Sequence, residues 1–180
     1  MVLAVLVAAC APSAASPSVP PVTASLAPAG SGAAVGLTSD PLHSVALYDV
    51  NSEATFTLGE LAADEPVLLE MMAIWCSNCR AQQSRVAESH QLTAFQSVSL
   101  DIDPNERPAD LAAYSASLAF NWRFAMANIN LASALRDRFG PAVLNPPSTP
   151  MVLLFPDGSI RALEFRAYTA EELAAEIAAG

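Results

Sequence analysis

Two cysteines with two residues between them, Cys76 and Cys79, are the side chains best placed to do chemistry in this chain. They directly follow an apolar run over Val67–Met72, which predicts a strand buried on both faces, and they begin a predicted helix that extends to about Ser89. Unpaired N–H groups and the dipole at a helix N-terminus favour an anion, which lowers the pKa of a thiol from about 8.5 to about 7 or below. We therefore expect Cys76 to be the nucleophilic thiolate and Cys79, one helical turn later, to resolve a mixed disulfide formed at Cys76.

The same cysteine pair is also the kind that supplies half of a zinc site, which requires two further Cys or His ligands. The chain offers only Cys10, His43 and His90 for this purpose. His43 lies at the edge of the predicted domain and His90 at the far end of the predicted helix, where we expect a surface residue. We therefore expect no metal and no cofactor beyond a redox-active disulfide between Cys76 and Cys79.

Composition and charge exclude several classes of protein. The chain has 180 residues, enough for one domain with appendages, and 53% of them are hydrophobic, which excludes a wholly disordered protein. The formal net charge is −10, from 18 acidic and 8 basic residues, so the chain would repel a phosphate backbone and no nucleic-acid binding is expected. Three cysteines are too few for a scaffold held together by disulfides.

The N-terminal segment predicts export and attachment to a membrane. Met1–Ala9 is apolar but far shorter than the ~20 residues of a spanning helix, so we interpret residues 1–10 as a signal peptide that ends in a lipobox. Cys10 would then carry lipid on the extracytoplasmic face of a bacterial membrane. The basic residues that usually begin a signal peptide are absent, and the alternative is a plain signal peptide or membrane-proximal stub with an incidental Cys10.

A change in composition after the lipobox predicts the domain boundaries. Residues 11–41 are rich in Ala, Pro, Ser and Gly and contain no aromatic side chain, so they cannot bury enough apolar area to offset the entropy cost of ordering. We predict a disordered tether over residues 11–41 that holds a folded domain, residues 42–180, away from the membrane.

The predicted domain alternates strand patterns with helix patterns, and these elements must position the cysteine pair. An α/β sandwich with helices on both sides of a central mixed sheet accounts for their order. Strands are predicted at residues 45–50, 54–58, 67–72, 98–102, 151–155 and 160–165, and helices at residues 76–89, 108–118, 130–139 and from Thr169 onward.

Three features at matching positions resemble the thioredoxin superfamily, and more narrowly its membrane-anchored TlpA-like branch. The strand that runs into the W-C-S-N-C sequence ending at Cys79 resembles that family's redox site, and Glu70 lies where thioredoxins keep a buried acid. Pro150, followed by an apolar strand and the turn glycine Gly158, is similar to the family's cis-proline region. The resemblance covers Val45–Gly180.

The resemblance implies a thioredoxin-like sandwich in which the 70 residues between Cys79 and Pro150 hold an extra strand and helix. It also implies a cis peptide bond between Thr149 and Pro150, packed against the cysteine pair; such a bond costs only about 0.5–1 kcal/mol. Trp75, Thr149 and Pro150 are then expected to bind substrate, with the backbone of Thr149 offered to an extended substrate strand.

Glu70 interrupts the apolar run of the predicted central strand, which leaves its carboxyl with little access to water. An unpaired buried carboxylate is costly, so the pKa of Glu70 should rise from about 4.3 towards 7. That value suits a group that takes the proton of Cys79 as this thiol attacks the mixed disulfide. The structural alternative is an ion pair with Arg80 or Arg161, in which Glu70 would stay ionised and idle.

The function predicted from these observations is that of a protein thiol–disulfide oxidoreductase. The resemblance implies protein thiol or disulfide partners, such as cytochrome c or metal-centre maturation factors, and an upstream membrane reductant. Ser77-Asn78 replaces the Gly-Pro or Pro-Pro common in reducing members, which leaves the direction of electron flow open.

Two other classes of function remain. Thiolates bind Cu(I) well, so a copper chaperone or a metal-centre assembly factor on the same fold could use the two cysteines. A copper chaperone of the SCO type would show a wider cysteine spacing and a distal histidine, and the sequence has no histidine after His90. A non-enzymatic interaction domain would need neither thiol.

Overall fold

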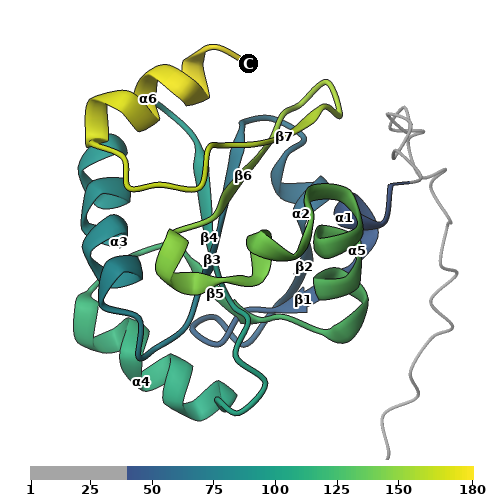
Figure 1. Ribbon diagram of the computed structural model, residues 1–180, viewed down its shortest axis with the longest axis vertical. Coiled ribbons are helices and arrows are strands. Elements are labelled where there is room, and N and C mark those ends of the chain that lie inside the picture. The colour runs from purple at the N-terminus through teal and green to yellow at the C-terminus, as the bar shows by residue number, and fades with distance from the viewer. Residues whose placement is uncertain (1–39) are drawn as a thin grey trace, which may run out of the picture. The chain divides into compact units, whose positions relative to one another are not determined.

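A mixed five-stranded sheet forms the centre of the protein, whose computed structural model describes residues 40–180 (Figure 1). In order across the sheet, the strands are β5 (Arg123–Met126), β4 (Gln96–Asp101), β3 (Val67–Met72), β6 (Met151–Leu154) and β7 (Ile160–Ala162). β3, β4 and β5 are parallel, whereas β6 is antiparallel to both β3 and β7. The α/β class with a central mixed sheet, predicted from the sequence, is confirmed.

The central strand β3 is buried at all six positions, which is the property that its apolar run predicts. Alternate side chains of a strand point to opposite faces of the sheet. Leu68 accordingly packs in one hydrophobic core and Leu69 in the other. The core on the Leu68 side is the one that contains Cys76 and Cys79.

Helices cover both faces of the sheet (Figure 1). The core that contains the two cysteines is built with residues of α3 (Ser77–Ser89), α4 (Pro108–Leu118) and α6 (Ala170–Ala178). The opposite core is built with residues of α1 (Pro41–Ser44), the hairpin of β1 (Ala46–Tyr48) and β2 (Thr55–Thr57), α2 (Leu58–Leu61) and α5 (Ile129–Phe139).

The chain between the cysteine pair and β6 carries two strand–helix units, β4–α4 and β5–α5. Two 3₁₀ helices that the sequence analysis did not predict then lead into β6. They are η1 (Pro141–Leu144) and η2 (Pro146–Ser148), and η2 lies against α3. Pro141 and Pro146 lie at the first positions of η1 and η2, where proline is tolerated because the N–H that it lacks would have no partner within the helix.

Local signals set several element boundaries where the sequence predicts them. α4 spans Pro108–Leu118 as predicted and ends where Ala119 adopts a left-handed conformation with φ 55°. The N-cap of α6 is Thr169, where the sequence predicts the start of a helix, and a capping box forms there. Thr169 Oγ1 accepts a hydrogen bond from Glu172 N–H at 3.2 Å, and the Glu172 carboxylate accepts one from Thr169 N–H at 2.8 Å. At the other end, Asp40 caps α1.

Cys10 and residues 11–39 of the predicted tether lie outside the described residues, so the signal peptide, the lipobox and the tether stay predictions. Within residues 40–180, every helix is too short or too polar to cross a bilayer.

Candidate active site

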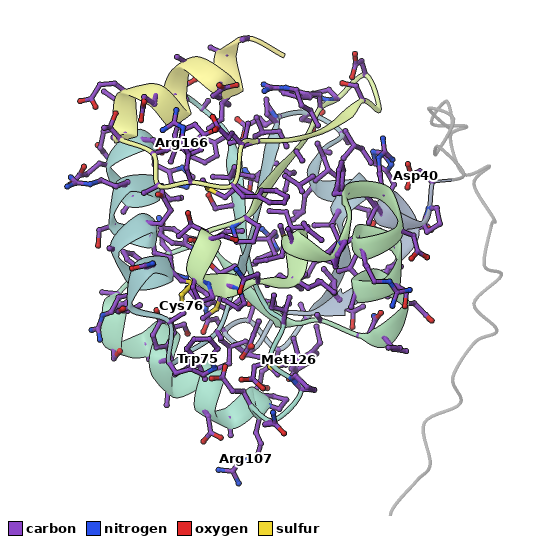
Figure 2. The ribbon with its side chains drawn as sticks, viewed as in Figure 1. Asp40, Trp75, Cys76, Arg107, Met126 and Arg166 are labelled. Atoms are coloured by element: carbon purple, nitrogen blue, oxygen red, sulfur yellow. A yellow bond between two sulfur atoms is a disulfide. The ribbon has the colours of Figure 1, made fainter. Side chains whose placement is uncertain are left out.

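The Cys76–Cys79 pair lies where β3 leads into α3, at the carboxyl edge of the parallel strands (Figure 2). The two sulfurs form a disulfide, and the two Cα atoms are 5.3 Å apart. Cys76 is the N-cap of α3, and its Sγ accepts a hydrogen bond from Cys79 N–H at 3.1 Å. A thiolate at Cys76 would therefore face the N–H groups of a helix N-terminus, the environment that lowers the pKa of a thiol.

The two cysteine residues are both buried and differ slightly in exposure. Cys76 is 3% exposed, whereas Cys79 is 0% exposed. The Sγ of Cys79 lies 3.2 Å from the carbonyl oxygen of Pro146, beneath η2, where the reduced thiol can donate a hydrogen bond. The geometry therefore favours first attack at Cys76 and leaves Cys79 as the internal thiol.

Trp75 presents an apolar ring to solvent directly beside the disulfide (Figure 2). Its side chain is 59% exposed, and its indole Nε1 donates a hydrogen bond to Asp103 Oδ2 at 2.7 Å. This hydrogen bond holds the pKa of Asp103 below its ordinary value. The indole is thus fixed by its polar edge while its faces stay available for contact with a partner protein.

The predicted cis bond between Thr149 and Pro150 is wrong, because none of the peptide bonds within residues 40–180 is cis. Thr149 instead adopts a left-handed conformation, with φ 49° and ψ 54°, and its N–H donates to Pro146 O at 2.8 Å. Pro150 O then accepts a hydrogen bond from Met71 N–H at 3.0 Å, which joins this segment to β3.

The segment before Pro150 nevertheless lies beside the cysteine pair, and η2 makes the contact. Asn78, between the two cysteines, donates from Nδ2 to Pro147 O at 2.9 Å. Together with the contact between Cys79 Sγ and Pro146 O, this hydrogen bond ties η2 to the first turn of α3. Residues that are about 70 positions apart in the chain thereby form one surface around the disulfide.

A groove of about 420 Å³ continues this surface away from the disulfide. Thr149 is only 3% exposed, and within the described part of the chain its Oγ1 has no hydrogen-bond partner. The groove is lined by Asn78, Ala81, Gln82, Arg85, Pro147, Ser148, Thr149 and the segment 165–168.

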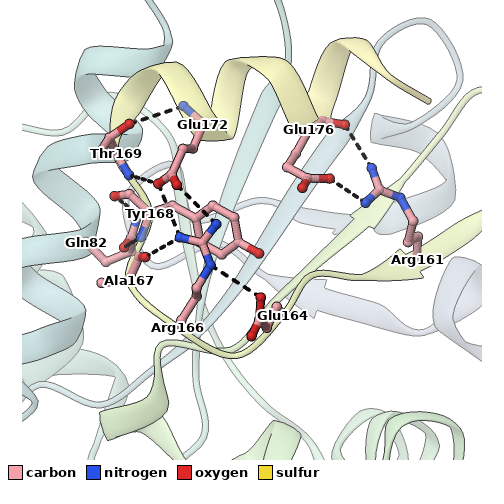
Figure 3. Close-up of polar contacts among 9 residues, drawn as sticks. All are labelled: Gln82, Arg161, Glu164, Arg166, Ala167, Tyr168, Thr169, Glu172 and Glu176. Carbon is pink, nitrogen blue, oxygen red and sulfur yellow. Dashed lines mark hydrogen bonds and ion pairs between the residues drawn. The ribbon is translucent and has the colours of Figure 1, made fainter.

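The far wall of the groove is held rigidly, as Figure 3 shows. Gln82 of α3 is buried; its Oε1 accepts from Tyr168 N–H at 2.8 Å, and its Nε2 donates to Tyr168 O at 3.4 Å. Arg166 stacks over the Tyr168 ring at 3.8 Å and pairs with Glu172 at 3.2 Å and Glu164 at 3.4 Å. Because both acidic partners already neutralise Arg166, the groove does not present it as a free cation.

Glu70 lies on the same face of the sheet as the disulfide and is 3% exposed. Its Oε2 accepts a hydrogen bond from Ser99 Oγ at 3.3 Å, whereas its Oε1 has no partner within residues 40–180. Burial raises the pKa of Glu70 to about 8, and the polar neighbours Ser99 and Gln83 oppose this rise. The carboxyl is thus protonated at neutral pH and close to the range in which it can exchange a proton.

The structural alternative for Glu70, an ion pair with Arg80 or Arg161, is wrong for the described part of the chain. Arg161 pairs with Glu176 at 2.6 Å, and Arg80 is exposed on α3. Whether Glu70 carries a proton during catalysis stays a prediction.

The sequence analysis missed a group of acidic residues at the end of β4 and in the loop that follows it. The carboxylate of Glu106 accepts hydrogen bonds from Ile74 N–H at 2.9 and 3.1 Å, next to Trp75. Asp101 is 1% exposed, and its Oδ1 accepts from Asp103 N–H at 3.0 Å. Burial, and then the neighbouring carboxyl of Glu106, raise the pKa of Asp101. The sequence Asp101-Ile102-Asp103-Pro104 could have indicated this group, because it marks the end of a predicted strand. Parallel strands end at one common edge of a sheet, which is where the cysteine pair lies.

The free energy of unfolding should fall as pH rises through the neutral range, and Asp101→Asn should remove part of that fall. The unfolded chain releases the Asp101 proton at the ordinary pKa of about 3.9, whereas the folded protein keeps it to higher pH. Above about pH 4 the unfolded state therefore binds fewer protons, and stability decreases up to the raised pKa. Urea unfolding at about pH 5, 7 and 9 measures this slope.

Asp157→Asn is the matched control for this measurement. Asp157 is an exposed carboxyl whose hydrogen bonds with Ser159 lower its pKa, so its removal cannot flatten the same slope. Equal slopes in the wild type and in Asp101→Asn would contradict the expectation.

His90 lies in a different environment from the one that the sequence predicts. The His90 ring is half-buried rather than on the surface: it stacks on Phe95 with centroids 3.9 Å apart, and its Nε2 lies 2.8 Å from Ser97 Oγ. No group of three or more His, Cys, Asp or Glu side chains within residues 40–180 is arranged to hold a metal ion.

Comparisons with known proteins find relatives in structure only. No family model matches the sequence, and no curated protein matches it. Among solved structures, a secreted disulfide oxidoreductase of Mycobacterium tuberculosis, described as homologous to E. coli DsbE, is 18% identical with a TM-score of 0.57, and the match covers 79% of this chain and 99% of that one.

Two further structures agree with this likeness. A thiol:disulfide interchange protein of the thioredoxin family from Chlorobium tepidum is 13% identical with a TM-score of 0.64, covering 75% of this chain and 91% of that one. An exposed lipoprotein thioredoxin from Streptococcus pneumoniae is 14% identical with a TM-score of 0.58, covering 76% of this chain and 98% of that one. The chain therefore has a thioredoxin-like fold, as the sequence resemblance implies.

Proposed function

We propose that this protein is a thiol–disulfide oxidoreductase that exchanges disulfides with partner proteins through Cys76 and Cys79. The observation that carries the proposal is the disulfide at the N-terminus of α3, between Cys76, which caps the helix and is 3% exposed, and Cys79, which is fully buried. A thioredoxin-like fold in which solved relatives are disulfide oxidoreductases supports the same function.

The exchange proceeds in two balanced steps. In the reducing direction the Cys76 thiolate attacks one sulfur of a partner disulfide, and the partner's other sulfur leaves as a thiolate. Cys79 then loses its proton and attacks the sulfur of Cys76, and the second partner sulfur leaves. Two electrons have passed to the partner, which ends as a dithiol, while the Cys76–Cys79 disulfide has formed. The reverse sequence oxidises a partner dithiol.

Glu70 is the group that takes the Cys79 proton in the second step. Three observations support this role. Glu70 is buried on the face of the sheet that carries the disulfide, its pKa is raised, and its Oε1 has no partner within residues 40–180. A carboxyl near its pKa at the working pH is an efficient proton acceptor and donor.

The partner binds as an extended segment across the disulfide. The exposed ring of Trp75 contacts it on one side, and the Thr149–Pro150 segment and the groove beside it receive the chain on the other. By the sequence resemblance, we propose protein partners that mature cytochrome c or metal centres, and an upstream membrane reductant that restores the thiols.

The site of action is the extracytoplasmic face of a bacterial membrane, with a lipid on Cys10. The apolar Met1–Ala9 segment before Cys10 supports this location, as do solved relatives described as a secreted protein and an exposed lipoprotein. All of these residues lie outside the described part of the chain.

The Cys10→Ala protein should move from the membrane fraction to the soluble fraction when it is produced in a bacterial host with lipoprotein processing. The reason is that two or more acyl chains attach a protein stably to a membrane. Replacing Cys10 removes the side chain that would carry them, so the anchor is lost. Western blotting of fractionated cells measures the shift, with Cys76→Ser as the matched cysteine control. Membrane retention of Cys10→Ala would contradict the anchor.

The proposed activity is tested directly with the purified full-length chain. The reduced protein is mixed with insulin, and the oxidised protein with a reduced, unfolded disulfide protein. Because exchange leaves the total number of thiols unchanged, the two proteins are separated before the free thiols of this chain are titrated. Loss of about two thiols per chain as insulin is reduced, or their gain in the opposite reaction, is the expected result. A chain that exchanges in neither direction but binds Cu(I) at near-stoichiometric amounts would instead be a copper chaperone.

A further inference from the structure

The hydroxyl of Ser99 joins three buried side chains on the face of the sheet that carries the disulfide. Ser99 lies on β4 directly opposite Glu70 of β3. Its Oγ accepts hydrogen bonds from Trp122 Nε1 at 3.0 Å and from Gln83 Nε2 at 3.2 Å, and it donates to Glu70 Oε2 at 3.3 Å. Ser99, Gln83 and Trp122 are 1%, 0% and 8% exposed, so water does not compete freely for these bonds.

The hydrogen bonds that Ser99 Oγ accepts from Trp122 and Gln83 determine where its own proton points. A hydroxyl has one proton and two acceptor positions. The indole Nε1 of Trp122 is a donor only, and the orientation of the Gln83 amide is set by Tyr114, whose hydroxyl donates to Gln83 Oε1 at 2.7 Å. With both acceptor positions of Ser99 occupied, its proton points to Glu70.

We propose that Ser99, oriented by Trp122 and Gln83, is a positioning residue that holds a hydrogen-bond donor against Glu70 and thereby keeps the ionised form of this carboxyl accessible during disulfide exchange. The proposal rests on the proposed function, because it assigns a residue that tunes the proton acceptor of the second step. Burial alone favours the neutral acid, and a donor aimed at one oxygen opposes that effect. The other oxygen, Oε1, remains open for the Cys79 proton.

Two ionisable groups border this network without a hydrogen bond to it: Asp101, two residues after Ser99 on the same face of β4, and His90, whose ring stacks on Trp122 with centroids 5.8 Å apart. Tyr114 of α4 belongs to it, and burial raises its pKa to about 12, so its hydroxyl stays protonated at neutral pH and remains the donor to Gln83. Cys79 of α3, when reduced, is the thiol on the same face. Glu70 is therefore the group in the network that changes charge near neutral pH.

The decisive experiment follows the titration of the Glu70 carboxyl by ¹³C NMR in Ser99→Ala and in the wild type, in the oxidised form. Loss of one hydrogen bond to a carboxylate should raise the titration midpoint by about one pH unit or more. Ser99→Thr, which keeps the hydroxyl, should restore it. The pH at which reduced Cys79 resolves a mixed disulfide should shift in the same direction.

A second variant keeps the test independent of the fold of Ser99→Ala. Trp122→Phe keeps a ring but removes the Nε1 donor that orients Ser99, so it should raise the midpoint by a smaller amount than Ser99→Ala. An unchanged Glu70 midpoint in every one of these variants that folds would overturn the proposal and leave Ser99 a packing residue. Because the titration is measured without exchange, failure of the proposed function and failure of this assignment are distinguishable.

Discussion

Replacing Cys76 with serine is expected to abolish disulfide exchange, whereas Cys79→Ser is expected to trap partner proteins as stable mixed disulfides. Cys76 is the sulfur that a partner can reach, so its loss removes the first attack and should lower the exchange rate by on the order of 10³-fold or more. Without Cys79 the first step still occurs, but no internal thiol releases the partner. Non-reducing gel electrophoresis of cell extracts measures the trapped adducts, and mass spectrometry identifies the partners.

Both variants are best made in a Cys10→Ala background, which leaves one thiol per chain in each. Alkylation rate as a function of pH then compares the two thiols directly. Cys76, the N-cap of α3, should react faster and titrate at lower pH than Cys79. If the thiol left in Cys76→Ser titrates lower, or if adducts accumulate in Cys76→Ser instead, the two roles are reversed.

The Glu70→Gln protein should resolve mixed disulfides about 10²-fold more slowly than the wild type at neutral pH, while alkylation of Cys76 changes little. Glutamine keeps the shape and polarity of Glu70 but cannot accept the Cys79 proton. In the wild type, resolution should accelerate as pH rises through the Glu70 pKa of about 8, and this inflection should be absent in the variant. Single-turnover release of a thiol leaving group measures the rate between about pH 6 and 9.

The pH dependence of the free energy of unfolding provides an independent test of Glu70→Gln. The unfolded chain releases the Glu70 proton near pH 4.5, whereas the folded protein keeps it to about pH 8, so wild-type stability falls across this range and then levels off. Glu70→Gln should therefore become more stable than the wild type as pH rises. Glu164→Gln, which removes a carboxyl that is 79% exposed, is the matched control. An unchanged exchange profile in Glu70→Gln would remove Glu70 from the mechanism.

Much of the site follows from local patterns that are visible in the amino-acid sequence. The apolar run Val67–Met72 and the polar stretch after it are sufficient to predict β3, α3 and a cysteine at the start of that helix, and these were confirmed. The burial of Glu70 follows from its place in that run. Proline at the start of α4 and the capping box at Thr169 mark helix boundaries that agree with the structure. Each of these features depends on residues within a few positions of one another.

The remaining features depend on contacts between residues far apart in the chain. The parallel register of β3 and β4 places Ser99 opposite Glu70, and the common edge of these strands brings Glu106 to Ile74. The alternation of polar and apolar residues in β4 fixes the face that each side chain takes but not its partner on β3, because a shift of two residues keeps the same faces. The trans bond before Pro150 has the same origin: the left-handed Thr149, bonded back to η2, is selected by the packing of that 3₁₀ helix on α3 and not by the proline itself.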